Sequence, residues 1–225
     1  MDAIDEETVQ GLDQLINVER DFKEALLIGE DILETLKDAP ILLSKVSAHV
    51  WFRVALAARL TKKDPSRFEK LMRTAPDYSL IMEGDLRRDQ ALQAIRRHQF
   101  KEAEQLLRDV AQMHEGSENR YAALQMVRGR LDLAKGNLKS AASHFRAADD
   151  NWALLGKKAD PQWVTNNLFH WLRCLVLLRD SDRFKVYTRF IVREPDTNRS
   201  QAASTMMLRG PLAAHGYGLL ERIAS

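Results

Sequence analysis

The chain has 225 residues, of which 45% are hydrophobic, and it carries a net charge of +2 at neutral pH. That length allows one substantial core or two small ones, and no apolar run approaches the roughly 20 residues that a membrane helix needs. Cys174 is the single cysteine, which excludes an intrachain disulfide and a metal site built from several thiolates. The first seven residues are acidic and lead into no apolar signal segment, so we expect a cytoplasmic protein.

The two charge signs are unevenly distributed along the chain. Residues 1–50 hold twelve acidic and four basic side chains, whereas residues 51–100 hold eleven basic and six acidic ones. The basic middle would attract acidic peptides or phosphates, although the same side chains also serve simply to solvate helix surfaces.

Apolar residues recur at three-and-four spacing nearly throughout, and sustained period-two alternation is missing, so the sequence predicts an all-α fold. Proline and glycine set the expected helix ends, as in Asp64-Pro65-Ser66 at a start and Gly136 at a stop. In chain order we expect helices over residues 12–18 and 22–33, from Asp38-Ala39-Pro40 past Ala57, from Ser66 to Pro76, and over 78–98, 100–113, 117–135, 138–155, 160–178, 182–192 and 200–223. The last of these is interrupted by Gly210-Pro211 and is expected to be kinked or split.

An apolar tetrad recurs five times, at steps of 46, 32, 38 and 46 residues. Each copy has an apolar residue, two mostly polar ones and another apolar residue. Such recurrence is typical of a solenoid, in which helix pairs stack and leave one long face free for a ligand. The five copies are Phe22-Lys23-Glu24-Ala25, Phe68-Glu69-Lys70-Leu71, Phe100-Lys101-Glu102-Ala103, Leu138-Lys139-Ser140-Ala141 and Phe184-Lys185-Val186-Tyr187.

The helix pair over residues 117–155 resembles the tetratricopeptide repeat, a family of helix-pair proteins. Small residues of that motif let two helices approach closely while a large residue fills the hole between them. The residues that carry the resemblance are Gly129, Gly136, Leu138, Ala141, Phe145 and Ala148, with Phe100, Ala103, Leu107 and Val110 in the preceding pair, where Ala91 replaces the helix-contact glycine. The remaining pairs depart from the motif, as with Gly29 at a large position and Tyr187 at a small one.

The resemblance implies a right-handed α-solenoid of about five antiparallel helix pairs. A single domain would cover residues 1–225, with repeats over about 6–193 and a C-terminal capping helix over about 199–223. A solenoid of another helix-pair family is the alternative.

In proteins of this family the first helix of each pair lines a concave groove that holds a peptide or a partner helix. By position, the resemblance places in that groove Arg88, Asp89, Leu92, Arg96, Met126, Arg130, Phe169, Leu172 and Arg173. This mixed basic and apolar lining suits an acidic-apolar peptide, because guanidinium groups pair with carboxylates. The family's carboxylate-clamp set of Asn and basic residues has no match here, so recognition of a chain terminus is not expected.

The resemblance thus implies a non-enzymatic protein-interaction module, such as an adaptor, chaperone or assembly factor. The alternative function is a regulatory repeat domain that binds a signal peptide or nucleic acid. Basic pairs such as Lys62-Lys63 and Arg96-Arg97 suggest nucleic acid, but they form no dense basic stripe. The C-terminal helix could also mediate self-association.

We expect no catalytic residue, cofactor or metal. The sequence holds no Gly-rich phosphate loop, no His-Glu-x-x-His motif and no paired cysteines, and its six histidines are scattered singly. Cys174 lies among Trp171, Leu175 and Leu178, which predicts a buried structural thiol rather than a reactive one.

Overall fold

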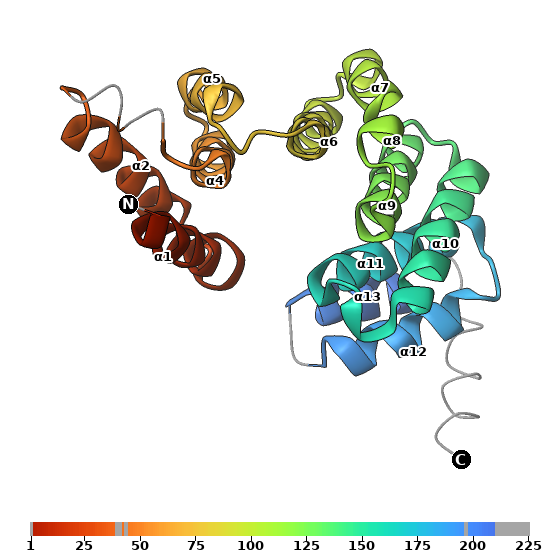
Figure 1. Ribbon diagram of the computed structural model, residues 1–225. Coiled ribbons are helices and arrows are strands. Elements are labelled where there is room, and N and C mark those ends of the chain that lie inside the picture. The colour runs from red at the N-terminus through yellow and green to blue at the C-terminus, as the bar shows by residue number, and fades with distance from the viewer. Residues whose placement is uncertain (1, 39–41, 43–44, 196–197, 210–225) are drawn as a thin grey trace. The chain divides into compact units, whose positions relative to one another are not determined.

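The computed structural model describes residues 2–38, 42, 45–195 and 198–209, and this part of the chain is all-helical, as the sequence predicts (Figure 1). It divides into two compact units, residues 1–86 and 87–225. Each unit has its own buried apolar cluster, and the boundary falls inside helix α6. The polar run from Arg87 to Gln90 separates Leu86, in the first core, from Ala91, in the second.

The first unit consists of short helices around an alanine-rich and valine-rich helix. Its elements are α1 (Asp2–Asp13), a π-helix η1 (Gln14–Glu19), α2 (Phe22–Thr35), α4 (Ala48–Leu60), α5 (Ser66–Thr74) and the start of α6 (Leu80–Arg96). At Gly29 of α2, an added Cβ would lie 2.2 Å from Cγ1 of Val54 on α4. Glycine therefore stands at this position because the two helix backbones approach too closely for a side chain.

The third predicted helix is interrupted between Leu42, which is helical, and Ala48. Ala39 and Pro40 lie outside the described residues, but Lys45 and Val46 are in a turn and a bend, and α4 begins only at Ala48. Ser47 precedes it, and its Oγ accepts a hydrogen bond from His49 N at 3.2 Å. Asp77 completes the cap, since its Oδ1 accepts from Ala48 N at 2.7 Å and its Oδ2 from Ser47 Oγ at 2.7 Å. These three hydrogen bonds fix the start of α4 at Ala48.

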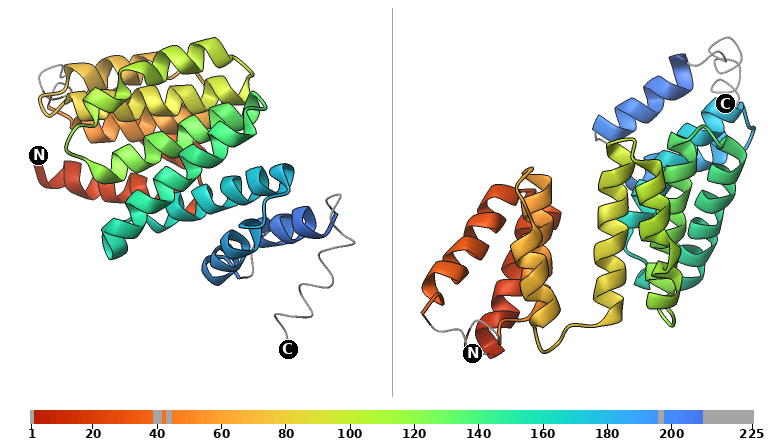
Figure 2. Two further views of the ribbon diagram at one scale, coloured as in Figure 1. Left: turned by 90° about the vertical axis from the view of Figure 1, so that its right-hand side faces the viewer. Right: turned by 90° about the horizontal axis from the view of Figure 1, so that it is seen from above.

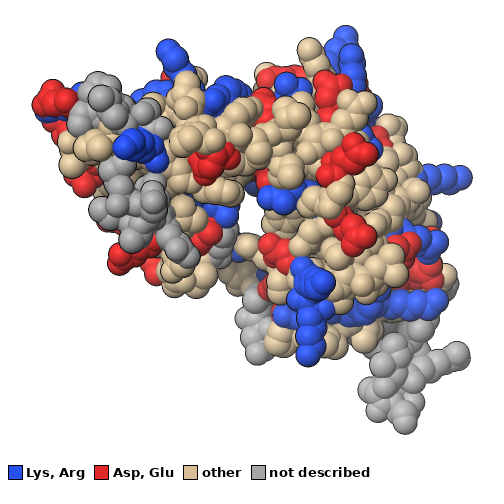
Figure 3. Space-filling model, in the orientation of Figure 1, with Lys and Arg blue, Asp and Glu red and all other residues tan. Residues whose placement is uncertain are grey.

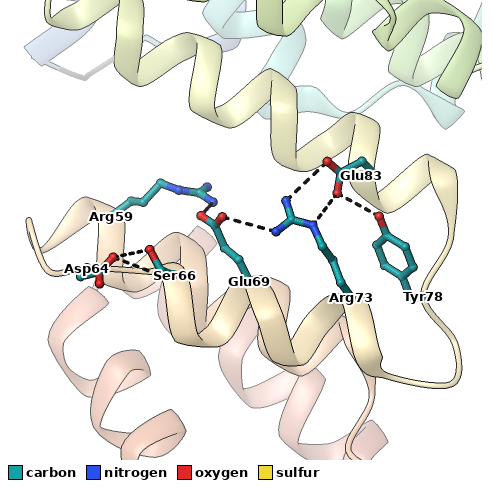
Figure 4. A network of polar contacts seen from close by, with 7 residues as sticks. All are labelled: Arg59, Asp64, Ser66, Glu69, Arg73, Tyr78 and Glu83. Carbon is teal, nitrogen blue, oxygen red and sulfur yellow. Dashed lines mark hydrogen bonds and ion pairs between the residues drawn. The ribbon is translucent and has the colours of Figure 1, made fainter.

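Charged side chains join α4, α5 and α6 inside the first unit (Figure 4). Glu69 pairs with Arg59, and its second oxygen lies 4.0 Å from Arg73 Nη1. Arg73 Nε in turn donates to Glu83 Oε2 at 3.1 Å, and the hydroxyl of Tyr78 donates to the same oxygen at 2.9 Å. Glu69 and Glu83 are both buried, so these partners are what make their burial tolerable.

In the second unit, helices that follow one another in the chain lie side by side (Figures 1 and 2). After α6 come α7 (Phe100–Arg108), α8 (Val110–Met113), α9 (Glu118–Ala134), α10 (Leu138–Leu155), a 3₁₀ turn η2 (Gly156–Lys158), α11 (Pro161–Leu178), α12 (Arg183–Arg193) and α13 (Asn198–Arg209). The predicted helix over 100–113 is thus divided at Asp109, while the helix over 138–155 has its predicted bounds.

The contact expected between α9 and α10 is present. A Cβ at Gly129 would lie 2.7 Å from Cε1 of Phe145, so the ring of Phe145 rests directly on the α9 backbone. The carbonyl of Phe145 also accepts a hydrogen bond from Nδ2 of Asn167 on α11 at 2.9 Å. Phe145 therefore links α9, α10 and α11.

The recurring tetrads mark helix starts in both units. Phe22, Phe100 and Leu138 are the first residues of α2, α7 and α10, and Phe68 and Phe184 lie in the first turn of α5 and α12. The repeated sequence pattern therefore corresponds to a repeated local structure, the first turn of a helix.

The described part of the predicted capping helix is α13, which packs on the second core through Ala203. Ser204 Oγ lies 3.1 Å from the hydroxyl of Tyr187 on α12. Gly210-Pro211 and the rest of the predicted cap, to residue 223, lie outside the described residues. Among the described helices, none has the length and apolar character needed to span a membrane.

Candidate functional site

One face of α11 carries four side chains at helical spacing: Asn166, Phe169, His170 and Arg173. Helix α13 places Arg199 against this face. Its Nη2 donates to Asn166 Oδ1 at 2.6 Å, and its guanidinium carbon lies 5.3 Å from the centroid of the Phe169 ring. The hydrogen bond and the cation–π contact hold Arg199 at α11.

His170 lies among aromatic rings and positive charges. Its ring stacks on Phe145 with centroids 6.3 Å apart and meets Phe169 edge-on at 5.4 Å. Burial lowers the pKa of His170 well below its ordinary value, and the charges of four arginines lower it further. His170 is therefore neutral at pH 7. The four arginines, which we call the arginine cluster, are Arg130, Arg199, Arg173 and Arg96.

The cluster draws its members from four helices: Arg96 ends α6, Arg130 lies on α9, Arg173 on α11 and Arg199 on α13. Burial lowers the pKa of Arg130 to about 10, with further contributions from the charges of Arg96 and Arg199. Arg130 is half-buried, whereas Arg96 and Arg173 are exposed. The low pKa of Arg130 thus has two sources, lost hydration and repulsion between like charges.

Counter-charges are scarce around the cluster. Glu194 Oε1 lies 3.9 Å from Arg199 Nη1, which is a loose ion pair. Within the described residues, no carboxylate lies within ion-pair distance of Arg96, Arg130 or Arg173. The charges of these three guanidinium groups are thus not balanced by an ion pair with a described residue.

Of the nine predicted groove residues, Phe169 contacts the His170 ring, and Arg96, Arg130 and Arg173 contribute charges that lower the pKa of His170. Two of the predictions are wrong, because Leu172 is 0% and Met126 is 5% exposed, and both pack in the second core, where they cannot contact a partner.

The other three predicted groove residues lie earlier on α6. Arg88 is 4% exposed, and its guanidinium lies 4.2 Å from the Trp163 ring centroid. Asp89 and Leu92 are half-buried, and Leu92 packs on the core. Arg88 in particular is committed to packing within the chain.

Three residues of this site, Asn166, His170 and Arg199, were not predicted from the sequence. Asn166 and His170 could have been found, because they share the α11 face with the predicted Phe169 and Arg173. Arg199 lies beyond the last repeat, in a segment where no repeat pattern assigns it a face, so the sequence carries no signal for it.

A second polar group lies between α9 and α10. Asp132 Oδ2 accepts a hydrogen bond from Ser140 Oγ at 2.5 Å and lies 3.6 Å from His144 Nε2. His144 Nδ1 is 2.8 Å from Gln125 Oε1. The serine donates to the carboxylate and not to the imidazole, so these residues lack the nucleophile-to-base contact of a catalytic relay. The cavity of about 270 Å³ beside them also has Glu104 and Arg108 in its lining.

Lysine and arginine side chains also gather along the lower edge of the second unit in the view of Figure 3, around α12. A cavity of about 570 Å³ there is lined by Asp149, Trp152, Lys157, Arg189 and Arg193 among others. Arg189 Nη1 donates to the buried Asp149 at 2.9 Å, so its charge is already balanced inside the chain.

Cys174 is buried, as predicted, and its thiol donates to the carbonyl of Leu138 at 3.1 Å. Burial raises its pKa to about 11, so the reactive thiolate is scarce at neutral pH. Among the described residues, no three His, Cys, Asp or Glu side chains lie close enough together to hold a metal ion. Comparison of the chain with protein families, curated proteins and solved structures finds no match.

Proposed function

We propose that the chain is a non-enzymatic interaction module, similar to tetratricopeptide repeat proteins, that binds an acidic segment of another protein at the arginine cluster. The observation that carries this proposal is that the charges of Arg96, Arg130 and Arg173 all act on His170, while no described carboxylate forms an ion pair with any of the three. The proposed similarity to tetratricopeptide repeat proteins is supported by the contact of Gly129 with Phe145 and by the tetrads at the helix starts.

An acidic ligand would relieve two costs of the unbound site. It would supply counter-charges to the mutually repelling guanidinium groups, and it would provide hydrogen-bond acceptors to Arg130, whose hydration is reduced by burial. Phe169 is half-buried between Arg199 and His170, so part of its ring can receive an apolar side chain of the same ligand.

The test is the affinity of acidic-apolar peptides, measured by fluorescence anisotropy at two salt concentrations. We expect the double variant Arg96→Gln/Arg173→Gln to bind at least about tenfold more weakly, since each lost charge-assisted hydrogen bond costs about 1.5–3 kcal/mol. Both side chains are exposed, so the variant should fold normally.

Arg97→Gln is the matched control, because Arg97 is an exposed neighbour of Arg96 that does not act on His170. Equal loss of binding in both variants would mean that general surface charge, and not the cluster, holds the peptide. Tighter binding of single-stranded RNA than of any peptide would point instead to nucleic acid.

A further inference from the structure

The cavity of about 570 Å³ in the second unit has a lining that is partly apolar and partly cationic. The lining residues come from the C-terminal part of α10, the turn η2, α11 and α12. Sites for small organic ligands in proteins have volumes of about 300–1,000 Å³, so the cavity has the size of such a site. It shares no residue with the arginine cluster and is therefore a separate candidate.

The apolar part of the lining is held in place by the core of the second unit. Trp152, Val164 and Leu168 line the cavity and belong to that core. The indole Nε1 of Trp152 also donates to Asn119 Oδ1 at 2.8 Å, which fixes the orientation of the ring. An apolar group that enters the cavity thus meets a surface that is formed in advance, and little ordering is needed on binding.

Four charged side chains complete the lining, of which three are positive and one is negative: Lys157, Arg189, Arg193 and Asp149. Arg189 Nη1 donates to Asp149 Oδ2 at 2.9 Å, and its guanidinium carbon lies 5.5 Å from the centroid of the Trp171 ring, so Arg189 is held on two sides. The charge of Arg193 also acts on Asp149, but from outside ion-pair distance.

The lining therefore has an excess of positive charge. Asp149 is already paired with Arg189, and among the described residues no carboxylate forms an ion pair with Lys157 or Arg193. A ligand with one negative charge would be attracted by this excess, whereas a cation would be repelled.

We propose that this cavity binds a small organic acid with an apolar body and one carboxylate. The apolar body lies against Trp152 and Leu168, and the carboxylate pairs with Lys157 and Arg193 at the rim. The proposed acidic protein ligand of the arginine cluster is not part of this inference, so each of the two can fail without the other.

Three eight-carbon probes that differ only in the head group test the inference: octanoate, octanol and octylammonium. Their dissociation constants for the full-length chain are measured at about pH 7, where the acid and the amine are both charged. We expect octanoate to bind about tenfold or more tightly than either of the others. The readout is the set of indole NMR signals from the four tryptophans. The signal of Trp152, assigned by its absence in Trp152→Phe, should move most.

One pair of double variants tests the head-group contacts. Lys157→Gln/Arg193→Gln should lower the affinity for octanoate to about that for octanol and leave octanol binding unchanged. Lys158→Gln/Arg179→Gln is the matched control, because it also removes two exposed positive charges of the second unit, but neither residue lines the cavity. The control should keep the full preference for octanoate.

A filling variant tests whether the probes enter the cavity. Ala153 lines it from an exposed position, so Ala153→Phe should occupy part of its volume without disturbing the core and should weaken octanoate and octanol alike. Circular dichroism confirms that each variant is folded. Equal affinities for octanoate and octanol, a preference that survives Lys157→Gln/Arg193→Gln, or unchanged binding in Ala153→Phe would each overturn the inference, as would a lack of binding by all three probes.

Discussion

Gly129 illustrates how one missing methyl group sets a helix-to-helix distance. The Phe145 ring occupies the space where a Cβ would stand, at 2.7 to 3.0 Å from that position. We therefore predict that Gly129→Ala destabilises the protein by about 1–3 kcal/mol despite the better helix propensity of alanine, because a packed ring must shift. Urea unfolding followed by circular dichroism measures the difference in unfolding free energy.

Gly11 provides the comparison, since it lies in α1 and a Cβ added there would have no atom within 4 Å. Gly11→Ala should be neutral or stabilising by up to about 1 kcal/mol. Combining Gly129→Ala with Phe145→Leu should cost less than the sum of the single changes, because the smaller side chain makes room. If the destabilisations of the two single variants simply added in the double variant, the contact between position 129 and Phe145 would not be the cause of the Gly129→Ala effect.

Asp77 governs the start of an element far from it in sequence. Burial acts to raise its pKa, but hydrogen bonds from Ala48 N and Ser47 Oγ outweigh burial and hold the pKa below the ordinary value. A carboxyl group with a lowered folded pKa stabilises the fold above its unfolded pKa of about 3.9 and loses this effect as the pH falls through the folded value.

We predict that Asp77→Asn lowers the unfolding free energy at pH 7 by about 1–2 kcal/mol, as expected for loss of a helix cap. The difference from the parent protein should shrink below about pH 4, where the carboxyl group is protonated in the unfolded state and then also in the folded state. Thermal unfolding across that pH range checks this. Asp31→Asn, at an exposed position on α2, should show no such trend.

The same contact explains where prediction of elements from sequence failed. The helix starts at Phe22, Phe100 and Leu138 were predictable because their signals are local. The start of α4 was not, because Asp77 lies 29 residues from Ala48, and local patterns do not reveal such a partner.

For the site, the α11 face was predictable from helical spacing. The contribution of Arg199 was not, because it depends on how α13 packs against α11.

At the scale of the whole molecule, the two cores should respond separately to mutation. Phe68 belongs to the first core and Phe145 to the second, and both are fully buried. We predict that Phe68→Ala and Phe145→Ala each cost about 3–5 kcal/mol locally and accelerate amide hydrogen exchange mainly within their own unit. Amide hydrogen exchange rates resolved by residue measure this acceleration in each unit. Equal acceleration of both units by either variant would indicate a single cooperative core.

The arginine cluster has a consequence for how this sequence can evolve. Its like charges and the partly lost hydration of Arg130 make the unliganded state less stable than the same fold with an apolar residue there. If the cluster binds the acidic ligand proposed above, selection for stability and selection for binding act in opposite directions at position 130. If a descendant lost its partner, arginine at this position would be among the first features to be replaced.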